Sequence, residues 1–349
     1  MHIGGVPGRL VGRRKFLITS VFVAVGFFAG LATTLAASEF LARGLTRLGT
    51  KLRLSEGLIG LFAALAADSP ELSSAVIALA SGAGAVGVGV IVGSNLFNLA
   101  ALLGLAAVIA GGVRIRRGPL LLDSAVGLFV LLVSAAMVAG VFAPGLSVAL
   151  IVPVAAGYVL VLATEHMRPR FSLLRPLLAS APHGIGEVPY ETSHDRPRST
   201  HQSWLPVALI PVALTGVVAG SLAMVREALA AAPSLHISPA VLGTIVLAAL
   251  TSLPNLWVAL HFARADRGTA LFSSAMNSNT INLVGGLLVP ALFIGVAATR
   301  GSLAYFGWLA DLTLLAVLAP LVRSRLSRVA GLLIIAIYAV FVLFRVIGV

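Results

Sequence analysis

The chain of 349 residues is 59% hydrophobic and only 10% charged, with a mean hydropathy of +1.05. Because ordinary soluble domains carry about 25% charged residues, this composition excludes a soluble globular protein and indicates a polytopic helical membrane protein. The net charge of +12 could suggest nucleic acid, but the basic residues lie between apolar segments, as residues that set membrane topology do. The absence of cysteine excludes disulfides and thiolate metal sites.

Hydropathy predicts ten membrane spans, because about 20 apolar residues are needed to cross a bilayer. They lie at roughly 17–41, 56–80, 86–111, 119–141, 145–165, 205–229, 238–263, 269–297, 303–322 and 329–348. The first span follows Arg13-Arg14-Lys15 and could be mistaken for a signal peptide. Its apolar stretch is too long for the core of a signal, which favours a retained helix.

One clearly polar stretch, residues 168–204, separates the fifth span from the sixth. It contains arginines, histidines, acidic residues and several prolines, a composition typical of a linker. Its histidines could bind a metal or sense pH, but at this spacing we expect a solvated loop. The sequence therefore predicts two halves of about five spans each, residues 1–167 and 205–349, joined by the linker 168–204.

Basic residues in the loops predict the orientation in the membrane. Most of them follow spans one, three, five, seven and nine, for example Arg47, Arg114, Arg264 and Arg325. By the positive-inside rule these loops and the central linker are cytoplasmic, which places both termini outside the plasma (inner) membrane. The basic residues ahead of the first span argue the other way: Arg9, Arg13, Arg14 and Lys15.

Two carboxylates interrupt an apolar helix in the stretch from Gly60 to Asn98. The apolar run 61–67 is followed by Asp68-Ser69-Pro70-Glu71. Carboxylates inside a membrane helix are costly unless they face a partner, a cavity or an ion. Asp68 and Glu71 are three residues apart and so share a helix face, and Pro70 frees carbonyl oxygens in the preceding turn. Because such oxygen ligands suit hard cations such as Na⁺ or Ca²⁺, the pattern predicts a cation site inside the membrane.

The second half repeats this pattern. Ser252-Leu253-Pro254-Asn255-Leu256 corresponds to Asp68-Ser69-Pro70-Glu71-Leu72, and Ser278-Asn279-Thr280-Ile281-Asn282 corresponds to Ser94-Asn95-Leu96-Phe97-Asn98. Since five is an odd number of spans, the two halves must insert with opposite orientation, as in many secondary transporters. We therefore predict an all-α polytopic membrane protein with about ten transmembrane helices in two inverted five-helix repeats. The alternative, a merely structural duplication, does not explain the polar residues at the repeated breaks.

These residues resemble the cation/Ca²⁺ exchanger superfamily, typified by Na⁺/Ca²⁺ exchangers. The two alpha-repeats of that family carry Gly-Thr-Ser-Leu-Pro-Glu followed by Gly-Ser-Asn-x-Phe-Asn or Asp. Residues 93–98 fit the second motif without change, and Thr251-Ser252-Leu253-Pro254 fits the first motif in its second copy. The resemblance implies that cations are bound by Glu71, Ser94, Asn98, Thr251, Ser252, Asn255, Ser278 and Asn282.

The chain departs from the family pattern in its charges. Asn255 replaces the second acidic ligand, Asn282 stands where many members carry Asp, and Asp68 adds a carboxylate to the first repeat. If Asp68 and Glu71 both face the cavity, the site reaches a charge of about −2 and could hold Ca²⁺; with a single carboxylate, a monovalent ion is favoured. Two such close carboxylates are not expected to ionise together without a cation, so one tends to stay protonated and proton coupling follows.

The resemblance and the pattern together predict a secondary active antiporter that exchanges Ca²⁺ against Na⁺ or H⁺ by alternating access. The alternatives are a monovalent Na⁺/H⁺ exchanger and a non-transporting membrane scaffold. We expect no enzyme activity, because no zinc pattern, nucleophile elbow or phosphate loop occurs in the site. We expect no cofactor, and partners limited to inorganic cations and lipid.

For four further acidic residues we expect roles outside the cation site. Glu39 and Glu227 lie near the ends of spans one and six, where we expect them at the interface or paired with Arg43 and Arg226. Asp123 and Asp311 lie early in spans four and nine, where we expect them to cap helices or pair with arginines.

Overall fold

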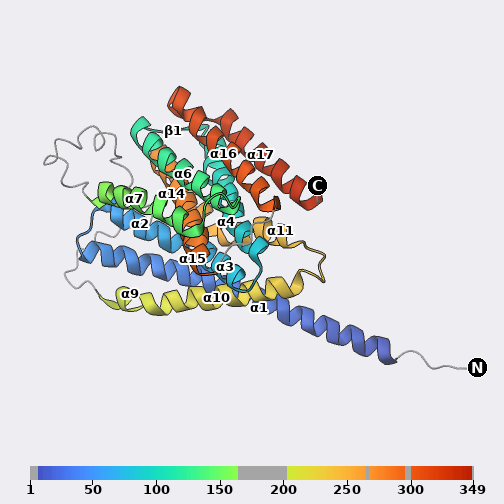
Figure 1. The fold of residues 1–349 in the computed structure, drawn as a ribbon. Helices are drawn as coiled ribbons and strands as arrows, with labels where there is room; N and C mark the ends of the chain where they lie inside the picture. Colours follow the sequence, from blue (N-terminus) through green and yellow to red (C-terminus); the bar gives the residue numbers. More distant parts are fainter. Residues whose placement is uncertain (1–6, 164–202, 265–266, 295–299, 348–349) are drawn as a thin grey trace, which may run out of the picture.

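A computed structural model describes residues 7–163, 203–264, 267–294 and 300–347 (Figure 1). The predicted linker 168–204 lies, except for its last two residues, outside this described part. The first half comprises α1 (Pro7–Lys51), α2 (Glu56–Ala67), α3 (Ser69–Ala80), α4 (Gly84–Asn98), the π-helix η1 (Leu99–Leu105), α5 (Ala106–Ile109), β1 (Gly112–Arg114), α6 (Arg117–Val138) and α7 (Pro144–Ala163).

The second half has the same order of five helical spans, but its strand lies before the fifth span rather than the fourth. It comprises α9 (Leu205–Ala208), α10 (Ile210–Ala231), α11 (Pro239–Val241), the π-helix η4 (Leu242–Leu247), α12 (Ala248–Thr251), α13 (Leu253–Arg264), α14 (Gly268–Leu283), the π-helix η5 (Val284–Leu288), α15 (Val289–Ile294), α16 (Arg300–Arg323), β2 (Arg325–Ser327) and α17 (Arg328–Ile347). A π-helix begins next to Asn98 in the first half and, after Asn282 and Leu283, at Val284 in the second.

The prediction of an all-α membrane protein with two five-span repeats is confirmed. Within the described residues, eight helices are long and apolar enough to cross a membrane. The two remaining spans are broken. The α2–α3 pair bends by 51°, and its counterpart runs from Pro239 to Thr251 and then continues as α13.

Each broken span has its break two residues before a proline. Asp68 is the one non-helical residue between α2 and α3, and Ser252 is its counterpart between α12 and α13. Pro70 and Pro254 then lie in the first turn of the next helix, where the missing N–H has no helical acceptor to satisfy. The sequence thus ends one helix and starts another in the middle of each span, and it leaves polar side chains at the break.

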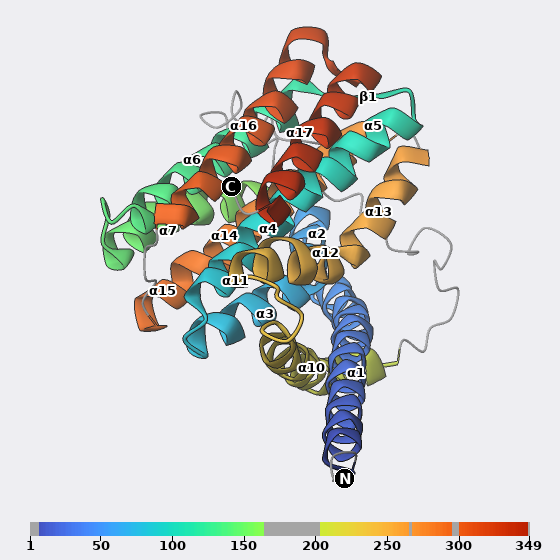
Figure 2. The same ribbon diagram turned by 90° about the vertical axis from the view of Figure 1, so that its right-hand side faces the viewer.

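Helices α1 and α10 form a pair at one side of the bundle, as both views show (Figures 1 and 2). Their backbones touch at two glycines. A Cβ at Gly30 would lie 2.6 Å from the amide nitrogen of Met224, and a Cβ at Gly220 would lie 2.7 Å from the carbonyl oxygen of Gly30. Such close packing of small residues is typical of membrane helices that associate as a unit.

The loops after spans three, seven and nine meet on one face of the molecule. β1 pairs antiparallel with β2, with Val113 opposite Leu326. The Arg116 amide donates to Thr269 Oγ1 over 3.1 Å. Three of the predicted basic loops therefore share one side, as the orientation argument requires. The first basic loop differs, because α1 continues to Lys51 and carries Arg43 and Arg47 on the helix.

Candidate cation site

Asp68 of the first break faces the second repeat. Its Oδ1 accepts hydrogen bonds from Ser278 Oγ at 2.6 Å and from Asn255 Nδ2 at 2.9 Å. The side chain is buried. The bend between α2 and α3 turns this carboxylate toward α13 and α14 rather than into packing within its own repeat.

Glu71, one turn later, makes the matching contact with the second break. Its Oε1 accepts from Ser252 Oγ at 2.9 Å and from Asn255 Nδ2 at 3.4 Å. Ser252 corresponds to Asp68 and Asn255 corresponds to Glu71 in the repeat. Asp68 thus bonds the counterpart of Glu71, and Glu71 bonds both the counterpart of Asp68 and its own counterpart. This reciprocal arrangement is what a pseudo-two-fold axis between inverted repeats produces.

A second reciprocal pair lies on α4 and α14. Asn95 Nδ2 donates to the carbonyl oxygen of Asn279 over 3.0 Å, and Asn279 Nδ2 donates to the carbonyl oxygen of Asn95 over 3.3 Å. Asn95 Oδ1 also accepts from Asn282 Nδ2 at 3.1 Å. The sequence analysis did not single out Asn95 and Asn279, although their place in both copies of Ser-Asn-x-x-Asn was a signal for them.

The other predicted ligands divide into two groups. Asn98 joins the carboxylate network, because its Nδ2 donates to Ser278 Oγ over 2.9 Å. The hydroxyls of Ser94 and Thr251 instead donate to carbonyl oxygens in the turn before the second break, including that of Ala248 for both. The structure therefore brings Asp68, Glu71, Asn98, Ser252, Asn255 and Ser278 together, while Ser94, Thr251 and Asn282 bond to groups beside them.

The buried site contains oxygen atoms that accept no hydrogen bond. Four of its oxygens lack a hydrogen-bond partner: Asp68 Oδ2, Glu71 Oε2, Asn98 Oδ1 and Asn282 Oδ1. The side-chain partners of the two carboxylates are two hydroxyls and an amide, and no basic side chain of the described residues pairs with either of them. Buried oxygens without a donor are costly, and a hard cation would satisfy them.

The donor set is that of an oxygen-coordinated ion. In the described part of the chain, no three His, Cys, Asp or Glu side chains gather into a cluster. Ligands for a cation would therefore be two carboxylates supplemented by amide and hydroxyl oxygens, which suit Ca²⁺ or Na⁺ better than a transition metal.

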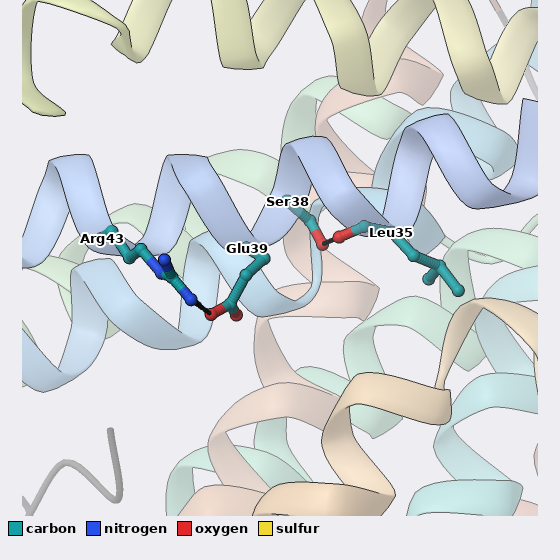
Figure 3. Close-up of polar contacts among 4 residues, drawn as sticks. All are labelled: Leu35, Ser38, Glu39 and Arg43. Carbon is teal, nitrogen blue, oxygen red and sulfur yellow. Dashed lines mark hydrogen bonds and ion pairs between the residues drawn. The ribbon is translucent and has the colours of Figure 1, made fainter. Parts of the chain in front are cut away.

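The predictions for Glu39 and Glu227 have different outcomes. Glu39 pairs with Arg43 at 2.9 Å, as expected, on the part-exposed side of α1 (Figure 3). Glu227 does not pair with Arg226 among the described contacts; its Cγ lies instead where a Cβ on Gly26 would come within 3.0 Å.

The expectation for Asp123 and Asp311 was wrong. Asp123 is buried inside α6 and accepts from Ser273 Oγ and Tyr158 Oη, so it neither caps a helix nor pairs with an arginine. Asp311 lies in the middle of α16, far from a helix end, and is exposed. Partners of Asp123 come from α14 and α7, which local sequence could not reveal.

Comparison with known proteins agrees with this architecture. A family model described as sodium/calcium exchanger protein matches residues 22–165 and 205–347. An uncharacterized membrane protein of Methanocaldococcus jannaschii is 25% identical over 328 residues, which cover 92% of this chain and 97% of that protein. Sodium/potassium/calcium exchanger 3 of Homo sapiens is 34% identical over 102 residues, but the match spans only 16% of that protein.

Solved structures show the same fold. The sodium-calcium exchanger NCX_Mj superimposes with a TM-score of 0.55 at 23% identity, over 92% of this chain and 98% of that one. The H⁺/Ca²⁺ exchanger CAX gives a TM-score of 0.70 at 16% identity, over 95% of this chain and 85% of that one. Since the family model covers most of both repeats, the chain is a membrane transport protein of the sodium/calcium exchanger family, within the cation/Ca²⁺ exchanger superfamily.

Proposed function

We propose that the chain is a secondary active antiporter that exchanges Ca²⁺ against Na⁺ or H⁺ at the site between the two helix breaks. The observation that carries this proposal is the placement of Asp68 and Glu71, whose Oδ1 and Oε1 both bond Asn255. Both carboxylates thus face one point, and together they supply a charge of about −2, which compensates a divalent cation in a low-dielectric interior.

Ligand number also supports Ca²⁺, which takes 6–8 oxygen ligands. The four unpartnered oxygens could be joined by the hydroxyls of Ser252 and Ser278, which already touch the carboxylates. The hydroxyls of Ser94 and Thr251 would complete the set after small rotations. The alternative, a monovalent exchanger, is supported by Asn255 and Asn282. Both side chains are neutral, whereas acidic residues at these two positions would bind a divalent ion more strongly.

Alternating access would move the α1–α10 pair past the rest of the bundle. The glycine contacts at Gly30 and Gly220 hold these two helices together as one body. This body touches α3 of the site region through a hydroxyl pair, because Ser221 Oγ on α10 lies 2.5 Å from Ser73 Oγ on α3. Within the body, Ser221 Oγ also lies 3.4 Å from Thr34 Oγ1 on α1. Hydroxyl contacts can exchange partners at little cost, so this boundary suits sliding.

For the domains and location, we propose two exchanger halves, 1–167 and 205–349, joined by a cytoplasmic linker at 168–204. The convergence of the basic loops on one face supports a single cytoplasmic side. On that basis the protein lies in the plasma (inner) membrane with both termini outside.

Isotope flux into proteoliposomes tests the proposed exchange. We expect ⁴⁵Ca²⁺ uptake when an outward gradient of Na⁺ or of protons is imposed, and none without a gradient. If ²²Na⁺ moves but Ca²⁺ does not move under any gradient, the monovalent exchanger is correct. If neither moves and calorimetry shows no cation binding, the scaffold alternative is supported instead.

A further inference from the structure

A second polar cluster lies inside the membrane between α6, α7 and α14. Asp123 Oδ2 accepts from Ser273 Oγ at 2.5 Å, and Asp123 Oδ1 lies 3.2 Å from Tyr158 Oη. Tyr158 Oη also lies 2.8 Å from Asn277 Oδ1. Asp123 is only 1% exposed, and none of these four residues is among the predicted cation ligands.

The hydrogen bonds of this cluster can all form if the Asp123 carboxyl group is protonated. Tyr158 has a single hydroxyl proton, and the shorter of its two contacts is to Asn277 Oδ1. If that proton goes to Asn277, the contact between Tyr158 and Asp123 needs a proton from Asp123 itself. The neutral acid then donates to Tyr158 and Tyr158 donates to Asn277, which satisfies all three groups.

The ionised form needs a different arrangement of the same groups. A carboxylate at Asp123 would accept the Tyr158 proton, and Asn277 would have to turn its amide so that Nδ2 donates to Tyr158 Oη. Gain or loss of the proton on Asp123 is therefore coupled to the orientation of the Asn277 side chain.

Comparison of the repeats shows that the Asn277 amide of this cluster has no counterpart in the first repeat. Asn277 stands where the first repeat has Gly93, at the position before the repeated Ser-Asn. The backbone of Gly93 lies directly against Thr244, which leaves no room for a side chain. In the second repeat the position carries an amide that reaches Tyr158, and the next residue, Ser278, donates to Asp68 at 2.6 Å.

Neighbouring helices provide no charge to stabilise an ionised Asp123. α6 packs against α14, α16, α7 and η5. In α7, α14 and η5, Tyr158 is the one titratable side chain and there is no charged residue. α16 contributes Asp311 and Arg323, which are both exposed, and Tyr305, which contacts Arg345; Arg117 at the start of α6 is exposed as well. A lone buried carboxylate is costly in such surroundings.

We propose that Asp123 is a proton-binding site, separate from the cation site, with Tyr158, Ser273 and Asn277 as its hydrogen-bond partners. Asp123 lies six residues from Arg117, about 9 Å along α6 from the basic face, and a proton taken up there from water would form the carboxylic acid. Its release would return the carboxylate and reorient Asn277 next to Ser278. The proton binding stands by itself, whereas its coupling to exchange rests on the proposed function.

Infrared spectroscopy of the full chain in lipid tests the proton binding. The C=O stretch of a protonated carboxyl group is recorded at neutral pH with saturating Ca²⁺, so that a cation occupies Asp68 and Glu71. We expect the band in the parent and in the control Asp311→Asn, and its loss in Asp123→Asn. A band of full intensity in Asp123→Asn, or no band in the parent, would overturn the proposal.

A second variant keeps the test valid if Asp123→Asn does not fold. Tyr158→Phe removes the acceptor of the Asp123 proton, so the band should move to higher frequency without loss of intensity. An unmoved band would contradict the assigned geometry. These spectra do not depend on transport and so remain decisive if Ca²⁺ exchange is absent.

Coupling is tested by flux. In Asp123→Asn, we expect proton-driven Ca²⁺ uptake to fall at least tenfold and Na⁺-driven uptake to stay within twofold of the parent. Equal losses in both modes, or no loss in either, would show that the proton on Asp123 does not take part in exchange.

Discussion

The two helix breaks have the same backbone and different charges. Each places one non-helical residue before a proline-containing first turn, but Asp68 and Glu71 are acidic where Ser252 and Asn255 are neutral. All the negative charge of the candidate site thus comes from one repeat. Inverted symmetry fixes where the polar side chains meet, whereas the ion responds to the total charge at the meeting point, whichever repeat supplies it.

The reciprocal asparagines, unlike the residues at the two breaks, are the same in both repeats. Asn95 and Asn279 are identical in the two repeats and exchange side-chain to backbone hydrogen bonds. Their function is to hold α4 against α14, and such a contact across a pseudo-two-fold axis requires the same residue on both sides. The comparison separates residues that maintain the symmetric fold from residues that set the charge of the site.

Removal of the Glu71 charge should have the largest effect. In Glu71→Gln, we expect ⁴⁵Ca²⁺ uptake into proteoliposomes to fall by about 100-fold or more, because loss of one charged partner from a buried ion pair costs about 3–5 kcal/mol. The matched control is Glu39→Gln on α1, which keeps its transport rate. Transport by Glu71→Gln at the rate of the parent would show that the site is assigned wrongly.

Moving the Asp68 charge from the first repeat to the second should have the next largest effect on Ca²⁺ uptake. Asp68→Ser should lower Ca²⁺ uptake about 10- to 100-fold while Na⁺ binding changes less, because a divalent ion depends more strongly on the total charge. Adding Asn255→Glu to Asp68→Ser restores a carboxylate from the second repeat and should recover most of the uptake.

The double variant distinguishes total charge from position. Single variants and the double variant are compared in one flux series, together with Asn255→Gln as a control for side-chain length. No recovery in the double variant would mean that Asp68 is required at its own position, and the two repeats would then not be interchangeable.

Loss of the reciprocal asparagines should reduce stability by an intermediate amount. Asn95→Ala removes hydrogen bonds of 3.0 Å with Asn279 and 3.1 Å with Asn282, whereas Asn279→Ala removes longer bonds of 3.3 Å with Asn95 and 3.5 Å with Asn98. A well-formed bond contributes about 1 kcal/mol and a longer bond contributes less, so we expect Asn95→Ala to be the less stable variant. Thermal unfolding in detergent measures this order, and the reverse order would contradict the contacts.

Hydropathy and proline act locally, so the spans, the repeat and the two breaks can be predicted from the sequence. It could not give the direction of Asp68, which depends on the 51° bend between α2 and α3. Asp123 was assigned to a helix cap because its partners, Ser273 and Tyr158, come from helices distant in the chain. The first span was predicted too short, since the basic residues at 43, 47 and 51 suggested a loop where the helix continues.

The smallest effect is expected where the repeats differ at the surface. Glu39 pairs with Arg43 on α1, whereas the counterpart Glu227 packs beside Gly26. Exposed pairs spaced i,i+4 contribute about 0.3–0.5 kcal/mol, so Glu39→Gln should move the unfolding temperature by no more than a degree or two.

Glu227→Gln keeps the shape of a partly buried side chain and removes its charge, so it should stabilise the α1–α10 pair slightly. Measuring both variants at low and high salt completes the comparison, because salt should reduce the difference between Glu39→Gln and the parent. A large loss of stability in Glu39→Gln would mean that this carboxylate belongs to the boundary on which α1 and α10 move.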